Sequence, residues 1–192
     1  MGGLIPAPQT RRSHKPPPAP QAPAGFLHVK FFLMPISSFT AIRLQHQHRT
    51  IRELAGGLPE ADLRRPVNPG KWSAFEQIAH LTAYQPIFAG RLKKIALEPA
   101  PVFDRYVAEN DPNFRACLER SPAALFDDID SGRRAILSAL EAGGEPLLSK
   151  TGLHTRYGLL TGNEWLEFFL LHEAHHLFVL FQLVQDLRKP SQ

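Results

Sequence analysis

Cysteine is nearly absent from this chain of 192 residues, since Cys117 is the only one. A single thiol cannot form an internal disulfide, so the fold does not depend on cross-links. The chain is long enough for one domain with a substantial core. The scarcity of cysteine also fits a reducing compartment, and we expect the protein to be cytoplasmic.

Long apolar runs are also missing. The most apolar stretch near the start, Phe26 to Ile36, is interrupted by His28 and Lys30. It is therefore too short for a membrane span and a poor core for a signal peptide. We expect no membrane partner.

Acidic residues are lacking in residues 1–33, which contain Arg11, Arg12, Lys15 and Lys30. The whole chain has 22 Lys and Arg against 18 Asp and Glu, so these four basic residues account for the net charge of +4. The remainder is balanced and offers no basic surface of the kind that attracts nucleic acid. We expect no nucleic-acid partner.

Residues 1–24 have an unusual composition, with seven prolines (Pro6, Pro8, Pro16, Pro17, Pro18, Pro20 and Pro23). Such a segment cannot build a packed core. We therefore predict that residues 1–33 are a disordered, basic extension and that residues 34–192 form the folded domain. Met34 stands just before the first predicted helix, and one hypothesis is that it is the true start of the protein.

Helical periodicity dominates the predicted domain, and no strand-like alternation of comparable length is present. Four stretches have this periodicity, at 38–55, 73–97, 122–141 and 161–187. They predict an all-α four-helix bundle with a long connection, residues 98–121, between its second and third helices.

Local signals mark where these helices begin and end. Ser73 with Glu76, and Thr161 with Glu164, have the spacing of capping boxes. Glycine pairs at 56–57 and 143–144 predict the ends of the first and third helices. Pro86 predicts a local break in the second helix.

The fourth predicted helix contains the densest cluster of chemically active residues, the run from His172 to His176. At about 100° per residue, His172 and His176 lie on the apolar face, His175 falls to its side, and Glu173 lies at a solvated edge. An unpaired buried polar group costs ~1–3 kcal/mol. Two inward imidazoles one turn apart therefore need buried partners or share a cation, and we favour the cation.

The same run matches H-E-x-x-H, the motif of zinc proteases. In that chemistry Glu173 would be the general base and a third ligand would follow in the sequence. No His or Glu follows His176, so the protease hypothesis is disfavoured.

A third ligand is available in the second predicted helix. His80 shares a face there with Tyr84, Phe88 and Ile95, so it also points inward. A lone histidine of this kind is usually a core residue with a hydrogen-bond partner. With the pair in the fourth helix, three imidazoles would instead form a site for one divalent ion, with positions left open for water or substrate. Zinc, nickel, copper or iron would suit such donors.

Two motifs resemble those of one known family. Asn68-Pro69-Gly70-Lys71-Trp72-Ser73, followed by His80-Leu81, resembles the start of the second helix in DinB/YfiT-like proteins. The stretch His154-x-x-Tyr157-Gly158-x-x-Thr161, leading into His172-x-x-x-His176, resembles their fourth helix and metal motif. The resemblance covers about residues 37–188. It implies metal binding by His80, His172 and His176, and homodimer formation. It also implies activities that include transferases and isomerases dependent on bacillithiol or mycothiol.

Taken together, these features predict a metal-dependent transferase that activates a low-molecular-weight thiol against a small-molecule substrate, because an ion deprotonates a coordinating thiol. A metal-dependent hydrolase using metal-bound water is one alternative. A non-enzymatic metal-binding or stress-related interaction protein is another.

The sequence gives weaker support for a role of several further residues at the metal site. Glu76, one turn before His80, could orient that ligand, although capping already explains it. Tyr157, with Arg156 and His154, could line the mouth of the site, and His175 leaves open which imidazoles of the fourth helix bind. Three other residues receive no role: Cys117 is expected to be inert, and Arg91 and Arg133 to be solvated or snorkelling charges.

Overall fold

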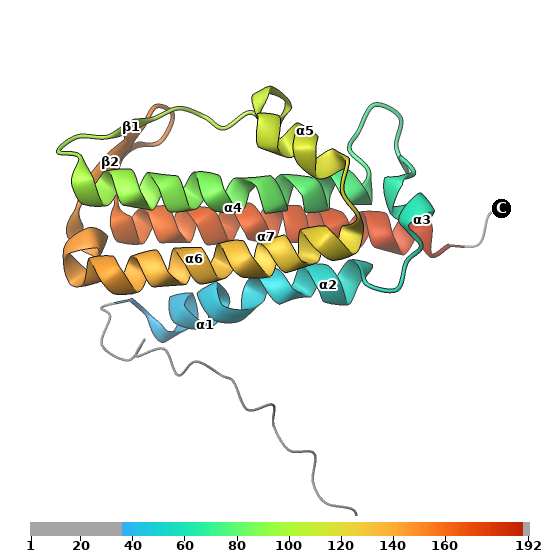
Figure 1. The fold of residues 1–192 in the computed structure, drawn as a ribbon, viewed down its shortest axis with the longest axis horizontal. Coiled ribbons are helices and arrows are strands. Elements are labelled where there is room, and N and C mark those ends of the chain that lie inside the picture. Colours follow the sequence, from blue (N-terminus) through green and yellow to red (C-terminus); the bar gives the residue numbers. More distant parts are fainter. Residues whose placement is uncertain (1–35, 190–192) are drawn as a thin grey trace, which may run out of the picture. The chain divides into compact units, whose positions relative to one another are not determined.

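The computed structural model describes residues 36–189, which form a bundle of long helices (Figure 1). The predicted four-helix bundle is confirmed. Its first rod is a composite of two helices and a 3-10 turn, and the other three rods are single long helices. In chain order they are α1 (Ser38–His46), η2 (Gln47–Arg49), α2 (Thr50–Ala55), α4 (Ala74–Leu97), α6 (Pro122–Ser149) and α7 (Gly162–Leu187). The predicted extension 1–33 and the proposed start at Met34 lie outside the described residues.

Both predicted capping boxes are present, and they start α4 and α7. The Ser73 hydroxyl accepts from the Glu76 amide at 3.2 Å, and the Glu76 carboxylate accepts from the Ser73 amide at 2.7 Å. Thr161 and Glu164 form the same pair of bonds at 3.2 and 2.7 Å. An N-terminal cap contributes about 1 kcal/mol. These two helices carry all three predicted ligands, so their starting points matter for the site.

Of the two interruptions predicted inside α4 and α6, the one at Pro86 is absent and the one at Gly144 is present. α4 runs through Pro86 as one helix. Tyr84 and Phe88, on either side of it, are buried in the core, and this packing holds the helix together despite the missing backbone donor. α6 changes direction at Gly144, where φ is +54°, but helical structure resumes and continues to Ser149.

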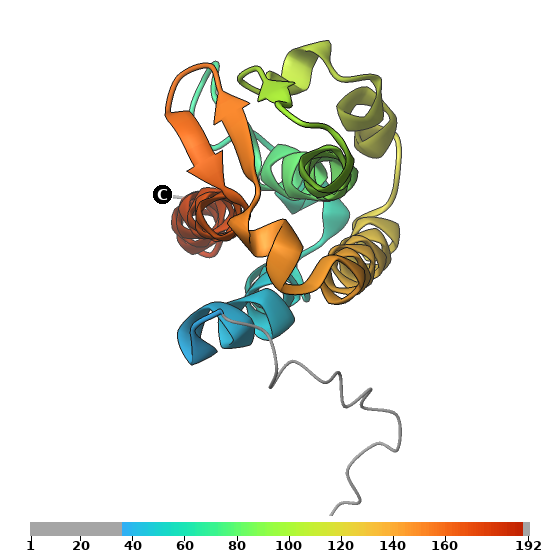
Figure 2. The same ribbon diagram turned by 90° about the vertical axis from the view of Figure 1, so that its left-hand side faces the viewer.

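A small sheet, which was not predicted from the sequence, joins the long connection to the start of α7. It consists of β1 (Val102–Phe103), β2 (Thr151–His154) and β3 (Gly158–Thr161) in that order. β1 is parallel to β2 with Phe103 opposite His154, and β2 is antiparallel to β3. Figure 2 shows the hairpin rising beside α7. Strands of two and four residues are too short to give a periodic signal.

The remaining elements are short helices at the edges of the bundle. α3 (Glu60–Arg64) precedes α4, whereas η3 (Ala108–Asn110) and α5 (Pro112–Leu118) belong to the long connection. Phe114 of α5 is only 4% exposed and packs with the core. The long connection therefore covers α4 instead of extending into solvent, as Figure 1 shows.

A charged pair lies in the middle of the bundle, contrary to the predictions of a solvated Glu173 and a solvated or snorkelling Arg133. Glu173 and Arg133 are 0% and 1% exposed and form a salt bridge between α7 and α6. Gln47 donates to the other carboxylate oxygen of Glu173 at 2.9 Å, and Arg133 donates to the Leu44 carbonyl at 2.8 Å. The helical wheel failed because α7 contacts neighbours on two sides, so the edge of its apolar stripe is also buried.

Candidate metal centre

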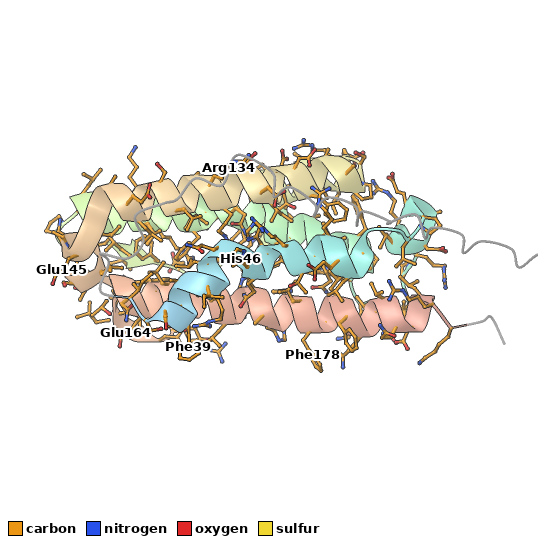
Figure 3. All side chains as sticks on the ribbon, turned by 90° about the horizontal axis from the view of Figure 1, so that it is seen from below. Phe39, His46, Arg134, Glu145, Glu164 and Phe178 are labelled. Carbon is orange, nitrogen blue, oxygen red and sulfur yellow. The ribbon has the colours of Figure 1, made fainter. Side chains whose placement is uncertain are left out.

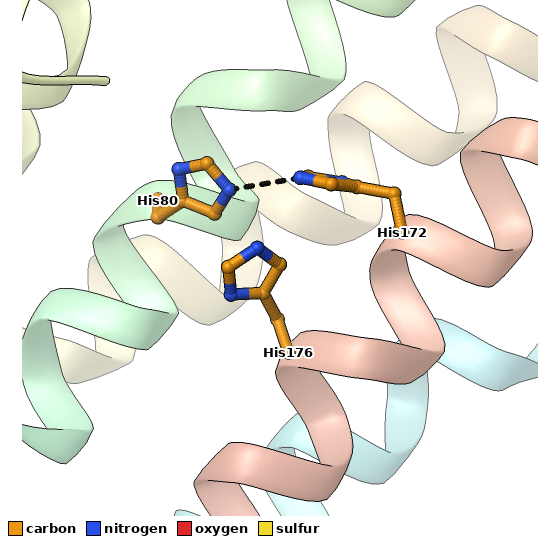
Figure 4. Close-up of side chains that lie close together, drawn as sticks. All are labelled: His80, His172 and His176. Atoms are coloured by element: carbon orange, nitrogen blue, oxygen red, sulfur yellow. Dashed lines mark hydrogen bonds between the residues drawn. The ribbon is translucent and has the colours of Figure 1, made fainter. Parts of the chain in front are cut away.

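Three histidines from two helices converge at one point (Figure 4). His80 comes from α4, and His172 and His176 come from successive turns of α7. One ring nitrogen of each lies within 4.8 Å of the others. The Nε2 atoms of His80 and His172 are 3.1 Å apart. Two nitrogens bound tetrahedrally to one ion at about 2.1 Å would lie about 3.4 Å apart, so the arrangement fits a divalent ion with little movement.

The protonation state of these rings also fits a metal. Burial, with a smaller contribution from neighbouring imidazoles, lowers the pKa of His80 to about 2 and that of His172 to about 3. The pKa of His176 falls to about 4 for the same main reason. All three rings are therefore neutral at physiological pH, which is the form that binds a metal ion.

Gln77 fixes the orientation of the His176 ring. The sequence analysis did not identify this residue. Its side-chain oxygen lies 2.7 Å from Nδ1 of His176. An amide oxygen can only accept, so Nδ1 of His176 carries the proton and Nε2 keeps its lone pair for a ligand. Gln77 stands three residues before His80, on nearly the same face of α4, and that spacing could have identified it.

Aromatic rings surround the triad. The Trp72 ring lies 5.1 Å from that of His80 and stacks on Phe114 at 5.3 Å. The Tyr84 ring lies 4.4 Å from that of His172, and Tyr106 packs against His80 at 5.6 Å. Trp72 belongs to the motif that leads into α4, and the structure gives it a physical role as a wall of the site.

The triad opens into a cavity of about 680 Å³. The residues suggested for the mouth, Tyr157, Arg156 and His154, line this cavity, as does the exposed side chain of His175. Glu76 is not among the lining residues, because its carboxylate is bonded to the backbone of Ser73. The cavity therefore brings together the triad and the hairpin between β2 and β3.

Glu173 has no access to this cavity. Its carboxylate is held by Arg133 and Gln47 on another side of α7, and it is not a lining residue. It cannot act as the general base that the protease motif requires, which agrees with the sequence argument.

The comparison with known families establishes the relationship. Residues 43–180, well over half of the chain, match the DinB superfamily. The chain belongs to the DinB superfamily. No curated protein matches it significantly.

Two solved structures resemble this DinB-superfamily chain. YfiT from Bacillus subtilis, described as a probable metal-dependent hydrolase with an unusual four-helix bundle topology, superposes with a TM-score of 0.64 at 16% identity. That match covers 78% of this chain and 89% of YfiT. TT2238, described as a four-helix bundle protein, gives a TM-score of 0.55 at 22% identity over 74% of this chain and 95% of its own. At these identities the likeness establishes a shared fold.

Two further observations bear on function in this superfamily member. Cys117 is buried, burial raises the pKa of its thiol, and it does not line the cavity. It is therefore protonated and does not open into the cavity, as expected of an inert cysteine. Within residues 36–189, no helix has the length and apolar character needed to cross a membrane.

Proposed function

We propose that this DinB-superfamily protein binds one divalent metal ion through His80, His172 and His176 and acts as an enzyme on a small molecule. The supporting observation is the convergence of three neutral imidazoles at the wall of a cavity. Three protein donors leave coordination positions open, which is typical of catalytic sites and not of closed structural ones. Imidazole donors suit zinc, nickel or iron.

The chain's own residues would hold and orient the ion. His80 is fixed by the packing of α4, and Gln77 holds His176 with its Nε2 lone pair available. Trp72, Tyr84 and the other aromatic rings limit the water that reaches the triad, and low polarity strengthens electrostatic interactions inside the site. A bound ion would supply the positive charge that deprotonates a coordinating thiol, or a water molecule, near neutral pH.

We infer that the group activated in this way is a low-molecular-weight thiol, so that the reaction is a thiol transfer. Among the cavity-lining residues, the only carboxylate is that of Glu109, which is exposed. Thiol activation by a metal needs no protein base, which suits a site without a buried one. The thiol-dependent enzymes implied by the family resemblance support the same choice.

Hydrolysis is the second candidate, and the description of YfiT favours it. A three-histidine site can lower the pKa of bound water to about 7, so the same residues would serve either reaction. A purely structural role for the histidines is less well supported, because the cavity of about 680 Å³ has the size of a small-molecule site.

Metal analysis followed by two assays tests the proposal. The full chain is purified without chelators, and its metal content is compared with that of His172→Ala and His176→Ala. His175→Ala is the matched control, since its side chain is exposed one residue away from His176. We expect about one ion per chain in the wild type and control and none in the other two variants. Wild-type metal content at background level would overturn the proposal.

The metal-bound protein is then assayed with a model thiol and a generic electrophile and, separately, with an activated ester. Thioether formation that depends on the metal supports the transferase. Metal-dependent ester cleavage alone supports the hydrolase. Metal binding with neither reaction would support the non-enzymatic alternative.

We also propose a homodimer, which the family resemblance implies, and a cytoplasmic location, which the scarcity of cysteine favours. Large apolar side chains are exposed on α1 and α7, and Figure 3 shows Phe39 and Phe178 projecting outward on the same side. Large exposed apolar side chains on one side of a protein are a feature of surfaces that a partner covers. Light scattering of the full chain would test the dimer, and a monomeric mass at micromolar concentration would contradict it.

A further inference from the structure

Arg91 is a buried arginine without a carboxylate partner in the part of the chain that the structure describes. It is 7% exposed and belongs to α4. Its Nη1 atom donates to the Tyr84 hydroxyl at 3.1 Å and its Nη2 atom to the Asp104 carbonyl at 2.8 Å. Neither acceptor carries a negative charge. Buried charges in proteins are normally paired, as Arg133 is with Glu173.

Aromatic rings form the rest of its surroundings. The guanidinium carbon lies 5.3 Å from the Trp165 ring centroid and 5.6 Å from that of Phe103. Ring faces offer a cation some compensation, but they leave the in-plane N–H donors unused. The bonds to Tyr84 and Asp104 occupy two of the five N–H groups of an arginine.

This guanidinium lines the same cavity as the histidine triad. Tyr84 connects the two sites, because its ring packs on His172 at 4.4 Å while its hydroxyl accepts from Arg91. One tyrosine ring thus separates the buried cation from the proposed metal ligands. A small molecule with one end at the triad could place its other end beside Arg91.

The charged side chains that line the cavity are predominantly positive. Arg105 and Arg156 line it together with Arg91, against the single carboxylate of Glu109. His154 adds a neutral donor. Its Nδ1 atom accepts from the backbone amide of Arg156 at 3.0 Å, which leaves the proton on Nε2.

We propose that this end of the cavity, centred on Arg91, binds the carboxylate of a small organic molecule whose other end reaches the histidine triad. The proposal rests on the proposed function, because it names the substrate class of that same site. A carboxylate is favoured over a phosphate because only one of the three guanidiniums is buried. A planar monoanion matches the planar arginine fork and one unpaired charge, whereas a dianion would bring excess negative charge into an aromatic pocket.

The test compares ligands that differ only in charge. Hexanoate and hexanol are titrated by NMR into the full, metal-free chain and into Arg91→Gln. Arg65→Gln is the matched control, because it removes the same charge from a side chain that is 58% exposed and does not line the cavity. We expect the wild type and the control to bind hexanoate at least about tenfold more tightly than hexanol. Arg91→Gln should bind both equally.

Equal binding of the two ligands by the wild type would overturn the proposal, and so would an unchanged preference in Arg91→Gln. Hexyl phosphate binding more tightly than hexanoate would also overturn it, in favour of a phosphate site. If Arg91→Gln does not fold, the NMR signals of the wild type test the proposal without the variant. Hexanoate should then shift the Nε–H signal of Arg91, and hexanol should not.

The metal-free design separates this proposal from the proposed function. A preference for hexanoate in a protein that binds no metal would support the carboxylate site while the metal proposal fails. Metal bound by the triad, with no preference for hexanoate, would support the metal proposal and overturn the carboxylate site.

Discussion

Two buried polar clusters lie against different sides of α7. One is complete, because its charged groups are paired, and the other is not. In one, Glu173 and Arg133 carry opposite charges and are linked to the first rod by Gln47. In the other, three neutral imidazoles and the cation of Arg91 surround a cavity without any buried acid. His172 and Glu173 are neighbours in the sequence, yet one faces each cluster. The complete cluster holds helices together, whereas the incomplete one has donors and lone pairs left for a ligand.

The largest expected effect comes from breaking the complete cluster. Glu173→Ala leaves the Arg133 guanidinium buried and unpaired, which should lower the free energy of unfolding by about 3–5 kcal/mol. Urea unfolding followed by circular dichroism measures this. Asp127→Ala removes an exposed partner of Arg52 and should cost less than about 1 kcal/mol. Equal effects from the two variants would show that the buried pair has no special role in stability.

A substitution in the histidine cluster should have the opposite effect: it should weaken metal binding and leave the fold stable. His172→Ala removes one of three proposed ligands and should weaken metal binding more than about 100-fold. The metal-free variant should stay folded, because no salt bridge is lost. Competition with a chromogenic chelator gives the affinity, and thermal unfolding of the metal-free protein checks the fold. A His172→Ala protein with wild-type metal affinity would remove this ring from the site.

A milder substitution tests whether Gln77 orients the proposed ligand His176. Gln77→Leu keeps the approximate size of the side chain but removes the acceptor for Nδ1 of His176. We expect metal affinity to fall about 10–100-fold. Gln77→Glu keeps an acceptor and should bind metal at least as tightly as the wild type. The same chelator competition applies, and no difference between Leu and Glu would show that the Gln77 contact does not orient the ring.

The contrast between the clusters also shows what could be predicted from the sequence. His172 and His176 followed from helical geometry, because both lie inside an apolar stripe that any packed helix would bury. Glu173 was misplaced because the wheel of one helix does not reveal how many neighbours that helix has. Arg91 was misjudged for a related reason: the ring of Trp165 and the carbonyl of Asp104 that surround it come from distant parts of the chain. The strands β1 and β2 depend on a pairing between residues about 50 positions apart, which no local pattern encodes.

Acid should distinguish the two clusters in the metal-free protein. Folding lowers the pKa of His80 to about 2 from an ordinary value of 6.5, mainly through burial. Below pH 6.5, His80 is therefore protonated in the unfolded chain but stays neutral in the folded chain. The contribution of this ring to the free energy of unfolding is complete above pH 6.5 and declines as the pH falls. Each such histidine should lower the free energy of unfolding by about 1.4 kcal/mol per pH unit within this window.

Urea titrations of the metal-free chain between pH 7 and pH 5 measure this slope. His80→Phe, which keeps a ring in the aromatic wall, should reduce the slope by about 1.4 kcal/mol per pH unit, the contribution of one histidine. A slope that His80→Phe does not alter would mean that His80 takes up protons equally in both states. In the metal-loaded protein, the folded-state pKa values of the three rings are about 2 to 4, so protons should displace the ion from the imidazoles only at about pH 4 and below. Metal released at about pH 6, well above these pKa values, would contradict the proton competition, whereas release below about pH 4 with intact helical structure would show that the ligand cluster opens while the Glu173 cluster still holds the bundle.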